Sequence, residues 1–123
     1  MSRTVIIGWP GTGKTTLAQK MGGGRSTDET IDMGLDWSAG SLEVSAWFDR
    51  PGPWIVEGVA VPRALRKWHA NNPGLPPPVD NIIVLRTVHK DLTNGQISMG
   101  KGIDTVMREI ESWLASVPTE YVD

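Results

Sequence analysis

A glycine-rich turn near the start of the chain constrains its fold more than any other feature. The turn follows a short apolar run, residues 4–7, and has the pattern Gly-x4-Gly-Lys-Thr, in which the fixed positions are Gly8, Gly13, Lys14 and Thr15. An apolar run bounded by glycine predicts a buried strand. Residues 14–21 can form a helix, and the three glycines at 22–24 would end it. A glycine-rich turn between a strand and a helix is typical of a loop that wraps around an anion.

Each residue type in this turn suits the binding of phosphates. The glycines let the backbone turn so that several N–H groups point inward, and the following helix adds the positive end of its dipole. Lys14 would neutralise the β- and γ-phosphates, and the hydroxyl of Thr15 would ligate Mg²⁺. We therefore expect a nucleoside triphosphate, with ATP and Mg²⁺ as cofactors, in a cradle formed by Gly8, Pro10, Gly11, Thr12, Gly13, Lys14, Thr15 and Thr16.

Predicted strands and helices alternate along the rest of the chain. Two apolar runs predict strands, and a polar stretch stands where an edge strand would lie: 54–56, 81–85 and 25–28. Helices are expected over 41–48, from Pro62 onward and over 104–116. Ser41 would cap the first of these helices. Residues 29–40 are predicted to form a loop, and the polar, glycine-containing stretch 87–102 a mobile, lid-like flap. Parallel strands need crossover helices, so this alternation predicts an α/β fold.

Length and charge narrow the class of protein. The 123 residues fit one domain, 1–123. A net charge of −2 offers no basic surface for duplex nucleic acid, and the lack of cysteine excludes zinc–thiolate sites and cysteine nucleophiles. No apolar run is long enough for a signal peptide or a membrane span, so we expect no membrane partner and a cytoplasmic location. The six tryptophans are expected to be core residues.

Two segments of the chain resemble a known family. The turn, Gly-x-Pro-Gly-x-Gly-Lys-Thr, resembles the P-loop, or Walker A motif, of adenylate kinases and related small-molecule kinases. The stretch Trp54-Ile-Val-Glu-Gly-Val-Ala-Val-Pro-Arg63 is similar to the strand of nucleoside monophosphate kinases that ends in an acidic residue and glycine and is followed by Pro-Arg. The resemblance implies a minimal, three-layer P-loop NTPase fold. Its small parallel sheet would have the order 2-3-1-4, flanked by helices. The chain departs from the family in having no clear fifth strand and no obvious helical insertion for the acceptor.

The resemblance also implies two acidic site residues. In that family the acid at the strand end helps to hold the water shell of Mg²⁺, and this position is Glu57 here. The acid after the second strand meets the acceptor or the metal-bound water, and this position is Asp28. From the residues alone, Glu57 ends an otherwise apolar strand at the sheet edge where ligands bind in open α/β folds, and Asp28 could accept a proton from an attacking hydroxyl. The alternatives are a solvated loop acid for Glu57 and a simple turn role for Asp28.

Basic residues complete the implied site. In the family an arginine after the acidic strand grips the phosphate of the acceptor, and this position is Arg63. It lies in the first turn of its predicted helix, where a cation opposes the helix dipole and so indicates a nearby anion. A solvated basic face of the helix is the alternative. A lid in the family closes over the phosphates with cations, for which Arg86 and Lys101 are the candidates. A plain surface loop is the alternative for the other cations of the flap, His89 and Lys90.

These observations predict a kinase that moves the γ-phosphate of ATP–Mg²⁺ to a small acceptor, a nucleoside or a nucleotide, by positioning and charge neutralisation. One alternative is a small ATPase that transfers phosphate to water and acts on, or is regulated by, a partner. A nucleotide-sensing module without turnover is another. A GTPase is disfavoured, because the chain has no Asn-Lys-x-Asp motif for base recognition.

Overall fold

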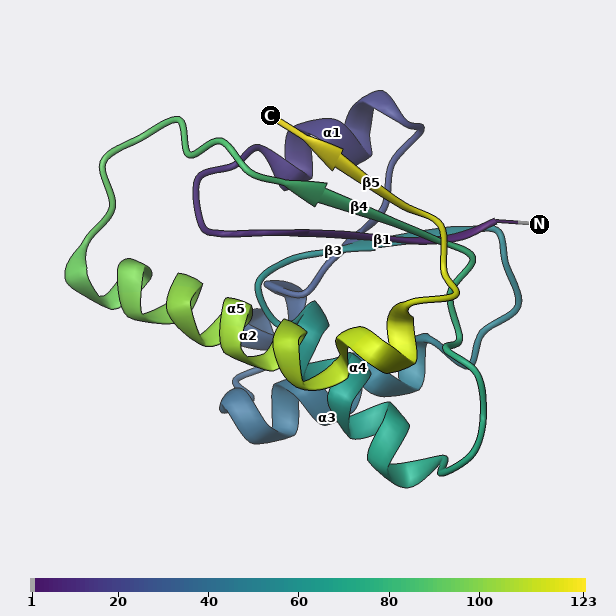
Figure 1. Cartoon of the computed structure of the whole chain (residues 1–123). Coiled ribbons are helices and arrows are strands. Elements are labelled where there is room, and N and C mark those ends of the chain that lie inside the picture. Colours follow the sequence, from purple (N-terminus) through teal and green to yellow (C-terminus); the bar gives the residue numbers. More distant parts are fainter. Residues whose placement is uncertain (1) are drawn as a thin grey trace.

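In the computed structural model of the chain, which describes residues 2–123, five strands form one all-parallel sheet (Figure 1). They lie in the order β2-β3-β1-β4-β5, with the bounds β1 Arg3–Gly8, β2 Arg25–Ser26, β3 Trp54–Glu57, β4 Asn81–Leu85 and β5 Thr119–Val122. The predicted strands and the order 2-3-1-4 are confirmed, except that the edge strand predicted over 25–28 ends at Ser26. The expectation that no clear fifth strand follows is wrong, because β5 pairs with β4.

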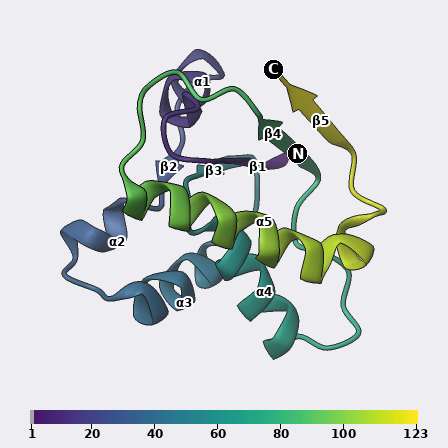
Figure 2. The same cartoon turned by 60° about the vertical axis from the view of Figure 1, so that its left-hand side comes forward.

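Helices cover both faces of the sheet (Figure 2). Helix α1, Lys14–Lys20, lies on one face. The other face is covered by α3 Trp37–Trp47, α4 Val61–Asn71 and α5 Asn94–Leu114, and a short helix, α2 Glu29–Asp32, precedes α3. None of the helices within residues 2–123 is long and apolar enough to cross a membrane. The structure is thus an α/β fold with a covered parallel sheet.

The central strand β1 is apolar toward both faces because both faces are covered. Val5 and Ile7 belong to the larger core cluster, which lies on the side of α3, α4 and α5, whereas Ile6 belongs to a smaller cluster with Ala18 of α1. Successive side chains of a strand point to opposite faces, so a continuous apolar run is typical of a strand buried on both sides. This burial fixes β1, and with it the position of the turn that follows at the carboxyl edge of the sheet.

The helix predicted from Pro62 is confirmed, whereas the start of the preceding helix is wrong. Pro62 lies in the first turn of α4, which buries Leu65 and Trp68. Helix α3 begins at Trp37 and not at Ser41, because Asp36 accepts a hydrogen bond from the backbone N–H of Ala39 at 2.8 Å and so caps the helix. The Ser41 hydroxyl lies inside the helix and donates to a carbonyl one turn earlier. Residues 29–40, predicted as a loop, therefore contain α2 and the first turn of α3.

Helix α5 begins ten residues before the predicted start at residue 104. Its first turn is closed by a capping box, in which the backbone N–H of Gln96 donates to the Thr93 hydroxyl and the Gln96 side chain accepts from the backbone of Thr93. The prediction of a flap over 87–102 is therefore wrong for residues 94–102, which are helical. The polar composition and three glycines of this stretch concealed the helix. Between β4 and α5, the connection from 86 to 93 has no regular secondary structure.

Candidate functional site

The glycine-rich loop, residues 8–15, connects the end of β1 to the start of α1 at the carboxyl edge of the sheet. Gly11 and Gly13 have φ angles of +79° and +88°, which residues with a side chain rarely adopt. Two hydrogen bonds within the loop hold its shape: the backbone carbonyl of Trp9 accepts from the Thr12 hydroxyl and from Nζ of Lys14, both at 2.8 Å. The backbone turn that the sequence requires is therefore present.

A pocket of about 350 Å³, here called the loop pocket, lies beside this loop. Most of the predicted site residues line it, namely Pro10, Gly11, Gly13, Lys14, Thr15, Thr16, Asp28 and Glu57. Of the other two predicted cradle residues, Gly8 lies in β1 and Thr12 is buried within the loop. Residues from the loop, from β3 and from the turn after β2 thus meet at one place, as the strand order requires.

The loop pocket has a buried cation and a buried anion. Lys14 is 8% exposed and Glu57 only 3%, so the alternative of a solvated loop acid at Glu57 is wrong. Burial lowers the pKa of Lys14, because it disfavours the charged ammonium; the charges of Glu57 and Asp28 oppose this shift and that of Lys90 adds to it. A charged lysine held away from water with its donors turned into a pocket is an arrangement suited to an anionic ligand.

Thr15 and Glu57 form the part of the pocket that suits a divalent cation. The Thr15 hydroxyl donates to Oε2 of Glu57 at 2.9 Å, which joins the start of α1 to the end of β3. Within residues 2–123, no group of three or more acidic, histidine or cysteine side chains is arranged to hold a metal ion. Mg²⁺ is usually bound by one or two protein oxygens together with substrate phosphates. The hydroxyl and the carboxylate therefore fit an ion that is bound together with phosphates.

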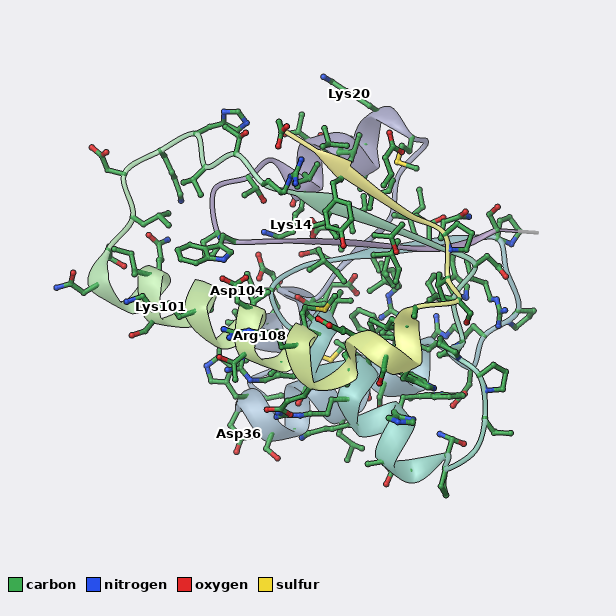
Figure 3. The ribbon with its side chains drawn as sticks, viewed as in Figure 1. Lys14, Lys20, Asp36, Lys101, Asp104 and Arg108 are labelled. Atoms are coloured by element: carbon green, nitrogen blue, oxygen red, sulfur yellow. The ribbon has the colours of Figure 1, made fainter. Side chains whose placement is uncertain are left out.

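Three predicted cations are not brought to the loop pocket. The guanidinium of Arg63 lies 5.4 Å from the ring centre of Trp37 and close to Gly102 of α5. Arg86 pairs with Asp123 at 2.9 Å, on the side of β5. Lys101 is exposed on α5, away from Lys14 (Figure 3). None of the three lines the pocket, so the roles assigned to them stay predictions.

Lys90 is a cation of the predicted flap for which the sequence left a plain surface loop as the alternative. The backbone N–H of His89 donates to the carbonyl of Gly11 at 2.8 Å, which fixes the connection after β4 against the glycine-rich loop. The side chain of Lys90 then lies over Gly11, where an added Cβ would come within 2.9 Å of Cγ of the lysine. Lys90 lines the loop pocket together with Gln96 and Met99 from the start of α5. The sequence signal for this part of the pocket was the capping pair Thr93 and Gln96, which marks the start of α5.

A second, smaller pocket adjoins the first. This adjoining pocket, of about 210 Å³, lies between α2, α3 and the end of β3, and it is mostly apolar. Both pockets are lined by Asp28, Ile31, Trp37 and Val59. Trp37 is 48% exposed, so the expectation that every tryptophan is a core residue is wrong for it. Asp28 is the charged residue at the boundary between the two pockets.

Comparison with known proteins adds no family to these observations. No protein-family model matches the chain, and no curated protein sequence matches it.

Proposed function

We propose that this chain is an ATP-dependent phosphotransferase of the P-loop class, a nucleoside or nucleotide kinase. The observation that supports it best is the position of Asp28, which lines both the loop pocket and the adjoining pocket. A transfer reaction needs two neighbouring sites, one for the donor and one for the acceptor, with an ionisable group between them. The loop pocket suits the phosphates of the donor, and the adjoining pocket suits a small organic acceptor.

The residues of the loop pocket would act by charge and position. Bound ATP–Mg²⁺ would supply the phosphoryl group and a cation that offsets the charge of the phosphates. Lys14, whose ammonium has two N–H donors besides the one bonded to the carbonyl of Trp9, would donate these to phosphate oxygens. Thr15 and Glu57 would hold the ion and its waters. Lys90, above Gly11, would oppose the negative charge that develops on the transferred group.

The residues of the adjoining pocket would hold the acceptor. Its apolar lining and the exposed ring of Trp37 suit a flat, partly apolar molecule such as a nucleoside. Asp28 would take the proton from the acceptor hydroxyl as its oxygen bonds to the γ-phosphorus, while the bond from that phosphorus to the bridging oxygen of ADP breaks. The γ-phosphoryl group thereby passes from one pocket to the other.

A small ATPase is the second candidate. It is favoured by the absence of arginine from the loop pocket, as far as residues 2–123 show, because kinases of the resembled family use arginines over the phosphates. In that case the phosphoryl group would pass to water, and the adjoining pocket would have another purpose.

One assay separates these proposals. The protein is incubated with ATP–Mg²⁺, with and without a panel of nucleosides and nucleoside monophosphates, and ADP and phosphorylated acceptor are quantified separately. For a kinase we expect phosphorylated acceptor in amounts that match the ADP. Asp28→Asn should lower this transfer by about 100-fold or more, whereas Asp32→Asn, on the exposed side of α2, should not.

The other outcomes of the assay are equally informative. ADP formation without a phosphorylated acceptor would favour the ATPase. Binding of ATP without turnover, lost in Lys14→Met and kept in Lys20→Met, would favour a sensing module. Absence of ATP binding in a folded wild-type protein would refute the P-loop proposal.

A further inference from the structure

The first half of α5 has few apolar anchors of its own. Within residues 94–102 only Gly100 is buried, whereas the second half of the helix buries Ile103, Val106, Ile110 and Leu114. The first half nevertheless contributes Gln96 and Met99 to the wall of the loop pocket. Contacts made by other parts of the protein are therefore important for its position.

Trp9 of the glycine-rich loop makes that connection. Its indole lies against Gly100, where an added Cβ would overlap the ring. Its Nε1–H donates to Oδ1 of Asp104, one turn further along α5, at 3.1 Å (Asp104 and Lys14 are labelled in Figure 3). Both contacts join the loop at the end of β1 to a helix more than ninety positions later in the sequence.

The backbone of the same residue holds the interior of the loop. Its carbonyl accepts the hydrogen bonds from Lys14 and Thr12. One residue thus contacts α5 through its side chain and the cation of the loop pocket through its main chain. A shift of the indole would move the peptide group that sets the position of the Lys14 ammonium.

We infer that Trp9 is a positioning residue, which fixes the glycine-rich loop against α5 and thereby sets the distance between Lys14 on one side of the loop pocket and Gln96 and Met99 on the other. The inference rests on the proposed function, because it concerns how well the pocket is arranged for a triphosphate. It does not depend on whether the phosphoryl group passes to an acceptor or to water.

Simple space filling by the indole is the competing explanation. Trp9 also lines a cavity of about 680 Å³ between the sheet and α5, together with Met107 and Tyr121. One part of its surface is therefore not enclosed by other side chains, and an apolar ring alone would have room to reorient. The hydrogen bond to Asp104 and the contact with Gly100 are what select one orientation.

Four variants test the inference, with ATP–Mg²⁺ binding measured by calorimetry. Trp9→Phe keeps an aromatic ring but removes the N–H donor, and Asp104→Leu removes the acceptor. Both should weaken binding by about 3- to 10-fold, less than a direct contact with the ligand would give, because this exposed hydrogen bond is also made in the ligand-free protein and affects affinity only through position. Asp104→Asn keeps an acceptor oxygen and should restore affinity to within about twofold of the wild type. The control is Trp113→Phe, which removes an indole hydrogen bond to the carbonyl of Leu75, remote from the pocket, and should change melting temperature but not affinity.

Hydrogen exchange of the ligand-free proteins gives a second readout that needs no nucleotide. Loss of the connection should increase exchange in residues 8–14 and 94–102 together in Trp9→Phe and Asp104→Leu, and not in Trp113→Phe. Wild-type affinity and exchange in both variants would overturn the inference. Should the wild type fail to bind ATP, the proposed function fails, and the exchange data alone decide whether Trp9 fixes the loop against α5.

Discussion

At the scale of single residues, two oppositely charged side chains that line the loop pocket, Lys14 and Glu57, are both buried. Burial lowers the pKa of Lys14, so around the folded-state pKa the folded protein binds fewer protons than the unfolded chain. Stability therefore rises with pH in that range, and at lower pH folding bears the cost of burying the ammonium. A bound phosphate would offset this cost. The buried ammonium of Lys14, which suits the pocket to an anion, therefore also destabilises the ligand-free protein.

Glu57 tests the proposed role in holding Mg²⁺. Glu57→Gln conserves volume and leaves an oxygen to accept the bond from Thr15, so the fold should be nearly unchanged. Mg²⁺-dependent turnover should fall by about 10- to 100-fold, as for other groups that orient a metal and its waters, with a much smaller loss of nucleotide affinity. Turnover is measured across a Mg²⁺ titration, with Glu120→Gln on the exposed strand β5 as the control. Equal titration curves for wild type and Glu57→Gln would make Glu57 a bystander.

Two lysines that follow β4 allow a matched comparison: Lys90 lies in the connection after the strand, and Lys101 lies in α5. Lys90 lines the loop pocket, whereas Lys101 is exposed on α5 and does not. Lys90→Ala should lower turnover by about tenfold, the lower end of the range for a contact to a charged group, because Lys90 is itself exposed. Lys101→Ala should have no effect. Turnover of the two variants is measured at saturating ATP–Mg²⁺. A larger loss in Lys101→Ala than in Lys90→Ala would instead support the lid role that the sequence predicted for Lys101.

The sequence predicted the parts of the site that depend on local spacing. Lys14 and Thr15 follow from the motif, and Glu57 follows from its place at the end of an apolar strand. Lys90 and Trp9 could not be found in this way, because their contacts exist only once α5 and the segment before it lie against the glycine-rich loop. Such contacts join residues far apart in sequence and leave no pattern in either segment.

At the scale of elements, a hydrogen-bonded clamp joins the beginnings of β1 and β4. Asp80 accepts from the backbone N–H of Arg3 at 2.7 Å and from its guanidinium at 3.1 Å, and the backbone N–H of Asp80 donates to the carbonyl of Arg3. These bonds to the Arg3 side chain and backbone lower the pKa of the Asp80 carboxyl. The clamp lies at the end of the sheet opposite the site, so it affects stability without touching the pocket.

This clamp predicts a pH-dependent stability. Because the pKa of Asp80 is lowered in the folded state, its contribution is fully present above about pH 4, where an unfolded aspartate is ionised, and is lost as the pH falls through the lower folded-state value. Asp80→Asn should therefore be less stable than the wild type at pH 7, and the difference should shrink toward pH 2. Urea unfolding at both pH values measures it, with Asp32→Asn as the control. A difference that stays constant over this range would contradict the clamp.

The prediction of elements failed where composition was given more weight than capping. Asp36 before α3, and the pair Thr93 and Gln96 before α5, were visible in the sequence as helix starts. The polar residues that follow them, and the glycines within α5, indicated loops instead. Strand β5 was missed for a different reason: its residues are all exposed and carry no apolar run. Only its pairing with β4 makes it a strand.

At the scale of the whole molecule, the strand order places the site. Because β1 lies between β3 and β4, the glycine-rich loop after β1 stands next to Glu57 at the end of β3 and next to the connection that carries Lys90 after β4. The alternation of strands and helices predicted a parallel sheet with crossover helices, and the family resemblance implied the order 2-3-1-4. The fold was therefore more predictable than the contacts made upon it.

The same strand order determines when the sheet can form during synthesis. The central strand β1 leaves the ribosome before the other four strands, and both of its partners follow much later: Val5 pairs with Val56 and with Ile82. Until residues of β3 emerge, β1 is an apolar segment with two unpaired edges, a state in which strands of different chains associate. A nascent chain must pass through this stage before any part of its sheet exists. The segment most buried in the finished protein is thus the one left exposed longest as the protein is made.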